Sequence, residues 1–216
     1  MRKLLFLFIT TIVLFSSMHA QVGTQKEVLN NISKSLEAAS RANFSEAIIQ
    51  SKQKGWPLEY KSKNNQTTSL IGIDSFGQPI YLTTYADPVH AVTVNTNLLW
   101  PGGTTGFNLS GSSDSITNRI GVWDESSPRL THNEFAGRLT LKDNASKTVD
   151  HPTHVSGIIM GKGVNPLAKG MAYGIKGAYA YDWNSDVSEM AAAAANGLLI
   201  SNHSYGTVSG WDYNKD

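Results

Sequence analysis

Three short segments of the sequence carry side chains that could perform acid–base chemistry or bind an extended peptide. The apolar run Arg119–Trp123 ends in Asp124, His151 follows 27 residues later, and a third segment runs from Ile200 to Gly206. A histidine can act as a general base near neutral pH, and a neighbouring carboxylate can hold its imidazole in the required tautomer. Taken singly, an Asp after a strand is more often a turn residue, and a His before a proline more often begins a helix. Only the combination of segments points to catalysis.

Metal binding is an alternative role for the histidines. His151 and His154 are three residues apart, with Pro152 and Thr153 between them. The helical zinc motif of hydrolases places its two histidines four residues apart, with a general-base Glu between them. We therefore predict no metal site here, and keep a metal hydrolase at His151 and His154 as an alternative that metal analysis of the purified protein would test.

The elements expected from about Trp100 onward alternate between strands and helices. Such alternation predicts an α/β fold, a parallel sheet flanked by helices, with ligand sites at the carboxyl ends of the strands. Asp124 and the segment Asn202–Gly206 each follow an expected strand, so we expect them at the same edge of the sheet. The expected strands are 119–123, 177–181 and 198–201, and the expected helices are 151–160 and 188–195.

A different pattern precedes the boundary that we place in the turn-rich segment Trp100–Gly106. Apolar residues at helical spacing predict a helix over 25–53, with a possible break at Asn43 or Ser45. Two apolar runs around a glycine-containing turn, 69–74 and 78–85, predict a hairpin, and 91–94 predicts a short strand. We interpret residues 21–97 as a small α+β leader or pro-segment, and residues 98–216 as a separate unit.

The first 20 residues predict a secretory signal peptide. Arg2 and Lys3 precede an apolar run that is too short to span a membrane, and Ala20 ends a stretch suited to cleavage. We expect a secreted or cell-surface protein, with no membrane span once the signal is removed. The chain has no cysteine, so its core must hold it together without disulfides. A formal net charge of +1 gives no electrostatic reason to expect a nucleic-acid partner.

Together, the segments Ile120–Asp124, His151–Gly157 and Ile200–Gly206 resemble motifs of the subtilisin-like serine proteases, peptidase family S8. An apolar strand ending in Asp, followed by His-x-Thr-His-Val-x-Gly at the start of a helix, matches the family's chain order of Asp, His and Ser. Gly170-Met171-Ala172 resembles the family's Gly-x-Ala. The fuller string resembles subtilases secreted by Bacteroidota-type bacteria.

The resemblance implies a secreted serine endopeptidase acting on protein or peptide substrates, and we expect a monomer. His151 would be the general base, and Asp124 would orient its ring. The backbone of Ser204, Tyr205 and Gly206 would bind an extended substrate, and Gly157 would let its helix pack closely. The sequence has no Gly-Thr-Ser nucleophile motif, so we expect the Ser and the oxyanion Asn beyond residue 216, and an inactive product from these residues alone. Calcium is common in the family, but we find no convincing calcium-binding loop.

Two positions depart from the family pattern, which has glycine where this chain has Ser126 and Pro152. If the turn after Asp124 needs a positive φ, a serine there is strained. The departures favour an alternative function, a catalytically degenerate secreted binding protein on the same fold. The retained Asp124 and His151 favour the protease. A Gly-Thr-Ser motif further along the gene would decide between them.

Overall fold

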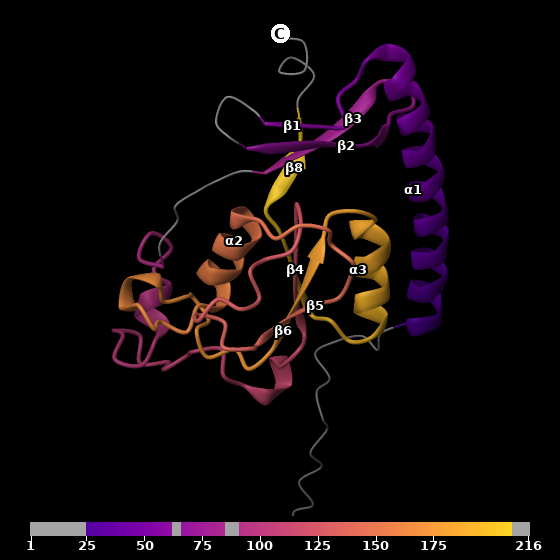
Figure 1. Ribbon diagram of the computed structural model, residues 1–216. Helices are drawn as coiled ribbons and strands as arrows, with labels where there is room; N and C mark the ends of the chain where they lie inside the picture. Colours follow the sequence, from indigo (N-terminus) through magenta and orange to yellow (C-terminus); the bar gives the residue numbers. More distant parts are fainter. Residues whose placement is uncertain (1–24, 62–65, 85–90, 209–216) are drawn as a thin grey trace, which may run out of the picture.

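A four-stranded parallel sheet forms the centre of the molecule (Figure 1). Its strand order is β5-β6-β4-β7, and each neighbouring pair runs parallel. The strands are β4 (Ile120–Asp124), β5 (Leu139–Leu141), β6 (Ala178–Asp182) and β7 (Ile200–His203). Helix α2 (Asp150–Met160) lies on one side of the sheet and α3 (Asp186–Ala195) on the other. The predicted parallel arrangement of 119–123 and 198–201 is therefore confirmed.

The computed structural model describes residues 25–61, 66–84 and 91–208. The predicted signal peptide, residues 1–20, lies outside the described residues. Within those ranges, no helix combines the length and the apolar character needed to cross a membrane.

The N-terminal part of the described chain contains one long helix and three strands. They are α1 (Lys26–Lys54), β1 (Glu59–Lys61), β2 (Thr67–Ile73) and β3 (Pro79–Thr84). The strands form an antiparallel sheet of order β1-β2-β3-β8, in which β8 (Tyr205–Thr207) comes from the other end of the chain. The predicted hairpin is confirmed as β2 and β3, joined by a turn at Gly77 with φ of 73°.

Helix α1 connects the two sheets on one side of the molecule (Figure 1). Near its start, the Ser33 hydroxyl donates to the Ser188 carbonyl of α3 at 2.7 Å. Near its end, Ala47 is buried against Leu70 and Tyr81 of the antiparallel sheet. The possible break at Asn43 or Ser45 is wrong, because α1 is one unbroken helix. The Asn43 side chain bonds to the sheet instead, where it accepts from the Ile73 N–H and donates to the Ile73 carbonyl.

Several short elements differ from the sequence prediction. The expected strand 91–94 is wrong: residues 91–95 are turns, in which the Asn95 and Thr96 amides donate to the nearby Val92 and Ala91 carbonyls. Because local partners satisfy this backbone, it does not join a sheet. Strands β1, β5 and β8 were not predicted. Three short 3₁₀ helices complete the described chain: Thr96–Leu99, Asp114–Ile116 and Pro166–Ala168.

The core that fixes the candidate site lies between the parallel sheet and α2. Ile120, Ala178 and Ala180 from the strands pack against Met160 of α2 and the buried ring of Phe135. Strand β4 is buried along its whole length, and Asp124 is its last residue, so the Asp124 side chain is buried at the carboxyl end of the sheet. Burial on both faces is typical of a central parallel strand, and it holds Asp124 rigidly.

Candidate active site

Asp124 ends the central strand and is fully buried. One of its carboxylate oxygens, Oδ1, accepts a hydrogen bond of 2.7 Å from the Glu125 amide. A buried carboxylate needs such donors, because an unpaired buried charge is strongly unfavourable. The Asp124 carboxylate also contacts the ring of His151.

His151 is the second residue of α2, and its ring reaches Asp124. Its Nδ1 lies 2.8 Å from Oδ1 and 3.0 Å from Oδ2 of the carboxylate. Only 10% of the His151 side chain and 1% of the Asp124 side chain are exposed. When Asp124 is a carboxylate it can only accept, so Nδ1 carries the proton and Nε2 holds the lone pair that a general base needs. The structure thus brings these two residues together as the motif order predicted.

The two departures from the family pattern are accommodated without strain. Among the described residues with positive φ there are eight glycines and five others, and Ser126 is not one of them. Its hydroxyl donates to the Lys147 carbonyl at 2.7 Å. Pro152 is the third residue of α2, where an amide has no partner inside the helix and its loss costs nothing. The concern that Ser126 is strained is therefore removed.

The segment Ser204–Gly206 lies beside Asp124 at the carboxyl edge of the sheet. In the parallel pairing of β4 and β7, Trp123 stands opposite His203, so the residues after β7 reach the edge where Asp124 lies. The backbone of this segment already has an extended partner: Tyr205 pairs with Thr84, and Gly206 with Thr83, in the antiparallel ladder of β8 and β3. Sequence reasoning predicted strand addition by a substrate here, and missed that β3 of the same chain supplies a strand.

Side chains around Tyr205 form an aromatic layer that the sequence did not reveal. The Tyr205 hydroxyl donates to Asp186 Oδ2 at 2.7 Å, and His203 Nδ1 lies 2.7 Å from the same hydroxyl. Burial, together with the bond to Asp186, raises the pKa of Tyr205, so the hydroxyl stays protonated. The rings of Tyr181, Trp123 and His203 stack in turn across three neighbouring strands, with centroids 4.1 and 5.2 Å apart. Rings contributed by three separate strands leave no local sequence pattern.

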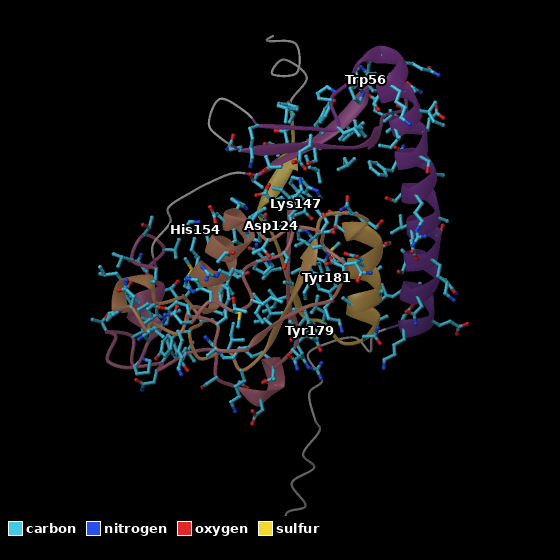
Figure 2. All side chains as sticks on the ribbon, in the orientation of Figure 1. Trp56, Asp124, Lys147, His154, Tyr179 and Tyr181 are labelled. Atoms are coloured by element: carbon cyan, nitrogen blue, oxygen red, sulfur yellow. The ribbon has the colours of Figure 1, made fainter. Side chains whose placement is uncertain are left out.

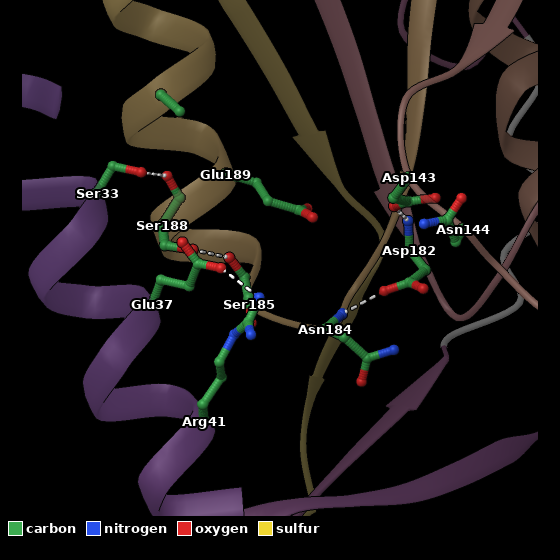
Figure 3. A pocket seen from close by; sticks show the side chains of 11 residues that line it. Ser33, Glu37, Arg41, Asp143, Asn144, Asp182, Asn184, Ser185, Ser188 and Glu189 are labelled. Atoms are coloured by element: carbon green, nitrogen blue, oxygen red, sulfur yellow. Dashed lines mark hydrogen bonds and ion pairs between the residues drawn. The ribbon is translucent and has the colours of Figure 1, made fainter.

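A cavity of about 360 Å³ lies where α1 faces α3 and the ends of β5 and β6 (Figure 3). Figure 3 shows Glu37 and Arg41 on the α1 side, Asp143 and Asp182 on the opposite side, and Glu189 of α3 between them. Burial raises the pKa of Glu189 to about 7, helped by the nearby carboxylates and opposed by the hydrogen bond from Trp123. Burial also raises the pKa of Asp143 and of Asp182.

A larger, mostly apolar cavity of about 970 Å³ lies along the outer side of α2. His154 and Gly157 line it, and a Cβ placed on Gly157 would meet no atom within 4 Å. The expectation that Gly157 allows close packing is therefore wrong for the described residues. His154 is exposed. Among the side chains that the structure describes, no group of three or more His, Cys, Asp or Glu is placed to hold a metal ion.

Comparisons of the chain with protein-family models, with curated proteins and with solved structures find no match.

Proposed function

We propose that this chain is the amino-terminal part of a secreted subtilisin-like serine endopeptidase, made of a leader and the first part of the peptidase unit. The observation that carries the proposal is the buried Asp124–His151 contact of 2.8 Å at the carboxyl end of the central parallel strand. In this arrangement His151 takes a proton from the attacking hydroxyl and passes it to the leaving amine, while Asp124 stabilises the imidazolium. The hydroxyl comes from a Gly-Thr-Ser segment that the present sequence does not contain.

The leader acts in this proposal as an inhibitor of the peptidase unit. Strand β3 occupies the backbone edge of Tyr205 and Gly206, the edge that an extended substrate would use. A substrate and β3 cannot pair with the same edge at once, so β3 must leave before hydrolysis. Helix α1 strengthens the docking by packing on α3, and the Lys147 ammonium adds an exposed ion pair to Glu59 at 2.9 Å.

The alternative is a binding protein on the same fold, without turnover. It drew support from the departures at Ser126 and Pro152. Because both residues are accommodated without backbone strain, that support is weakened. The retained Asp124–His151 contact favours the peptidase.

The decisive experiment begins with the gene sequence beyond codon 216. We expect a Gly-Thr-Ser motif there, and casein hydrolysis by the secreted gene product. His151→Ala should lower the rate by at least about 10⁴-fold, because the nucleophile then has no base. His154→Ala is the matched control: it lies on the same helix, is exposed, and should leave the rate nearly unchanged.

Two results would count against the proposal. A gene that continues without a Gly-Thr-Ser motif, with a product that binds peptides without cleaving them, supports the binding protein instead. Hydrolysis that is lost on chelation and tracks bound zinc supports the metal hydrolase.

A further inference from the structure

The segment Lys147–Val149, directly before α2, is tied to the end of β4. The Lys147 carbonyl accepts two hydrogen bonds, from the Ser126 hydroxyl at 2.7 Å and from the Ser127 amide at 3.1 Å. The Val149 amide donates to the Ser127 carbonyl at 3.1 Å. These bonds join the residues after Asp124 to the residues before His151, and Figure 2 labels Lys147 close to Asp124.

A second tie fixes the first turn of α2 to the same loop. The Thr153 hydroxyl donates to the Val149 carbonyl at 2.8 Å and accepts from the Arg129 amide at 2.8 Å. Every other donor or acceptor in these hydrogen bonds is a backbone group. Ser126 and Thr153 are therefore the two side chains that take part in them. Thr153 belongs to the recognised motif, whereas Ser126 stands where the family pattern has glycine.

Ser126 is suited to hold this geometry. It is 7% exposed, so water competes little for its hydroxyl, and its backbone needs no unusual conformation. A glycine at this position would supply no donor and would leave the loop freer. The hydroxyl therefore adds a constraint between the two catalytic elements that glycine lacks.

We propose that Ser126 is a positioning residue for the Asp124–His151 pair, acting through the Lys147 carbonyl. The effect of this positioning on catalysis rests on the proposed peptidase function. The positioning itself concerns only the geometry of the Asp124 and His151 side chains. Without the Ser126 hydroxyl, the segment before α2 keeps one of its two bonds at Lys147, and the His151 ring can shift relative to the carboxylate. Displacements of about 1 Å at a reacting group lower rates by about 10²-fold.

Proton NMR on this chain observes the hydrogen bond between Asp124 and His151 directly. The His151 Nδ1 proton, held between two buried groups, should give a resonance at unusually low field, and His151→Ala should abolish it. Ser126→Ala should move or broaden that resonance and shift the pH at which His151 titrates. Ser126→Thr, which keeps the hydroxyl, should restore the original spectrum and titration.

Ser127→Ala is the matched control. It removes a neighbouring buried hydroxyl that donates to the Pro128 carbonyl, and it leaves the backbone bonds to Lys147 in place. It should leave the resonance where the unchanged chain has it. If Ser126→Ala fails to fold, as judged by the loss of dispersed amide signals, Ser126→Cys takes its place, because it keeps the volume and weakens the donor.

The outcomes separate the two proposals. A resonance and titration in Ser126→Ala that equal those of the unchanged chain overturn the positioning role, whatever the activity of the gene product. A gene product that holds the pair but hydrolyses nothing overturns the peptidase, and leaves the role of Ser126 standing.

Discussion

Burial of Asp124 strengthens the interaction of its carboxylate with the His151 ring. A carboxylate with 1% of its side chain exposed meets the His151 ring and the Glu125 amide, with little water to screen either bond. Such a group stabilises an imidazolium more than an exposed carboxylate does, because the effective dielectric constant around it is lower.

Replacing Asp124 tests that role without changing the size of the side chain. Asp124→Asn should lower casein hydrolysis by the gene product by about 10⁴-fold, because an amide can donate to Nδ1 and stabilise the wrong tautomer. The measurement is kcat/KM, with circular dichroism to show that the fold is retained. A loss of less than tenfold would mean that His151 does not depend on this carboxylate.

Glu134 has a structural role that the sequence did not suggest. Burial alone would raise its pKa, but three backbone amides outweigh burial and lower it; they belong to Asn165, Gly163 and Val164, at 2.8, 2.6 and 3.1 Å. The carboxylate thus fixes the loop that follows α2.

Glu134→Ala should lower the free energy of unfolding in urea by roughly 1–3 kcal/mol at pH 7, because three backbone amides lose a charged, buried acceptor. A lowered carboxyl pKa stabilises the fold above the ordinary value of 4.5, and this stabilisation is lost as pH falls through the folded-state pKa. The difference between the variant and the unchanged chain should therefore shrink in acid. Glu37→Ala, which breaks an exposed ion pair, is the control and should change stability by less than about 1 kcal/mol.

At the scale of elements, the tight backbone approach lies at the end of α2. A Cβ on Gly170 would stand 2.4 Å from the Gly161 amide nitrogen and 2.8 Å from the Gly157 carbonyl oxygen. The amides of Gly170, Met171 and Ala172 also donate to carbonyls of α2 or of Gly161. The chain before β6 therefore packs directly on the helix backbone, and Gly170 makes this possible.

Two alanine substitutions should therefore have opposite effects. Gly170→Ala should destabilise the fold by several kcal/mol, since backbone atoms cannot move aside as a flexible side chain can. Gly157→Ala should be neutral, or should stabilise the fold by up to about 1 kcal/mol, because it meets open space and favours the helix. Urea unfolding of both variants checks this, and a destabilising Gly157→Ala would show that α2 has a close neighbour on that side.

The sequence predicted the elements whose pattern is local and long enough to read. Helix α1 falls near its expected position because its apolar residues repeat at helical spacing over many turns. The β2–β3 hairpin and strand β4 do so because each is a continuous apolar run bordered by turn residues. Strands β5 and β8 have three residues each, too few to show a period of two, and their partners lie far away in sequence. The site divides in the same way. Asp124 and His151 lie in local motifs and could be predicted, whereas the pairing of Tyr205 with β3 depends on a strand far away in the sequence and could not.

At the scale of the whole molecule, docking of α1 encloses several carboxylates. The cavity between α1 and α3 is lined by Glu37 and Arg41 from α1, Asp143 and Asp182 from the strand ends, and Glu189 from α3. Asp186, also on α3, adds a further negative charge near Glu189. Arg41 is the one cation among the described lining residues, and it pairs with Glu37.

Packing of α1 against α3 should therefore weaken as pH rises. A carboxyl whose pKa is raised stabilises the docked state below its ordinary value of 4.5, and this stabilisation is lost as pH rises through about 7. Because the chain has no cysteine, Lys34→Cys with Val187→Cys gives a specific pair of labels on α1 and α3. Energy transfer between dyes at these positions should fall between pH 5 and pH 8.

Glu189→Gln is the control for this pH dependence, because it imitates the protonated carboxyl. It should keep most of the energy transfer at pH 8. A pH profile that is the same with Glu189 and with Gln would exclude this carboxyl as the cause.

The antiparallel sheet unites strands from opposite ends of the described chain, since Thr84 of β3 pairs with Tyr205 of β8. During synthesis, the β2–β3 hairpin can form as soon as it emerges, but its outer edge has no partner until nearly all the described residues have been made. Contacts of such long range are slow to form, because the entropy of closing the loop must be lost before the contact is gained. We therefore expect late folding, with an exposed strand edge in the incomplete chain. That delay would leave the outer edge of β3 open to pairing with other chains until β8 has been made.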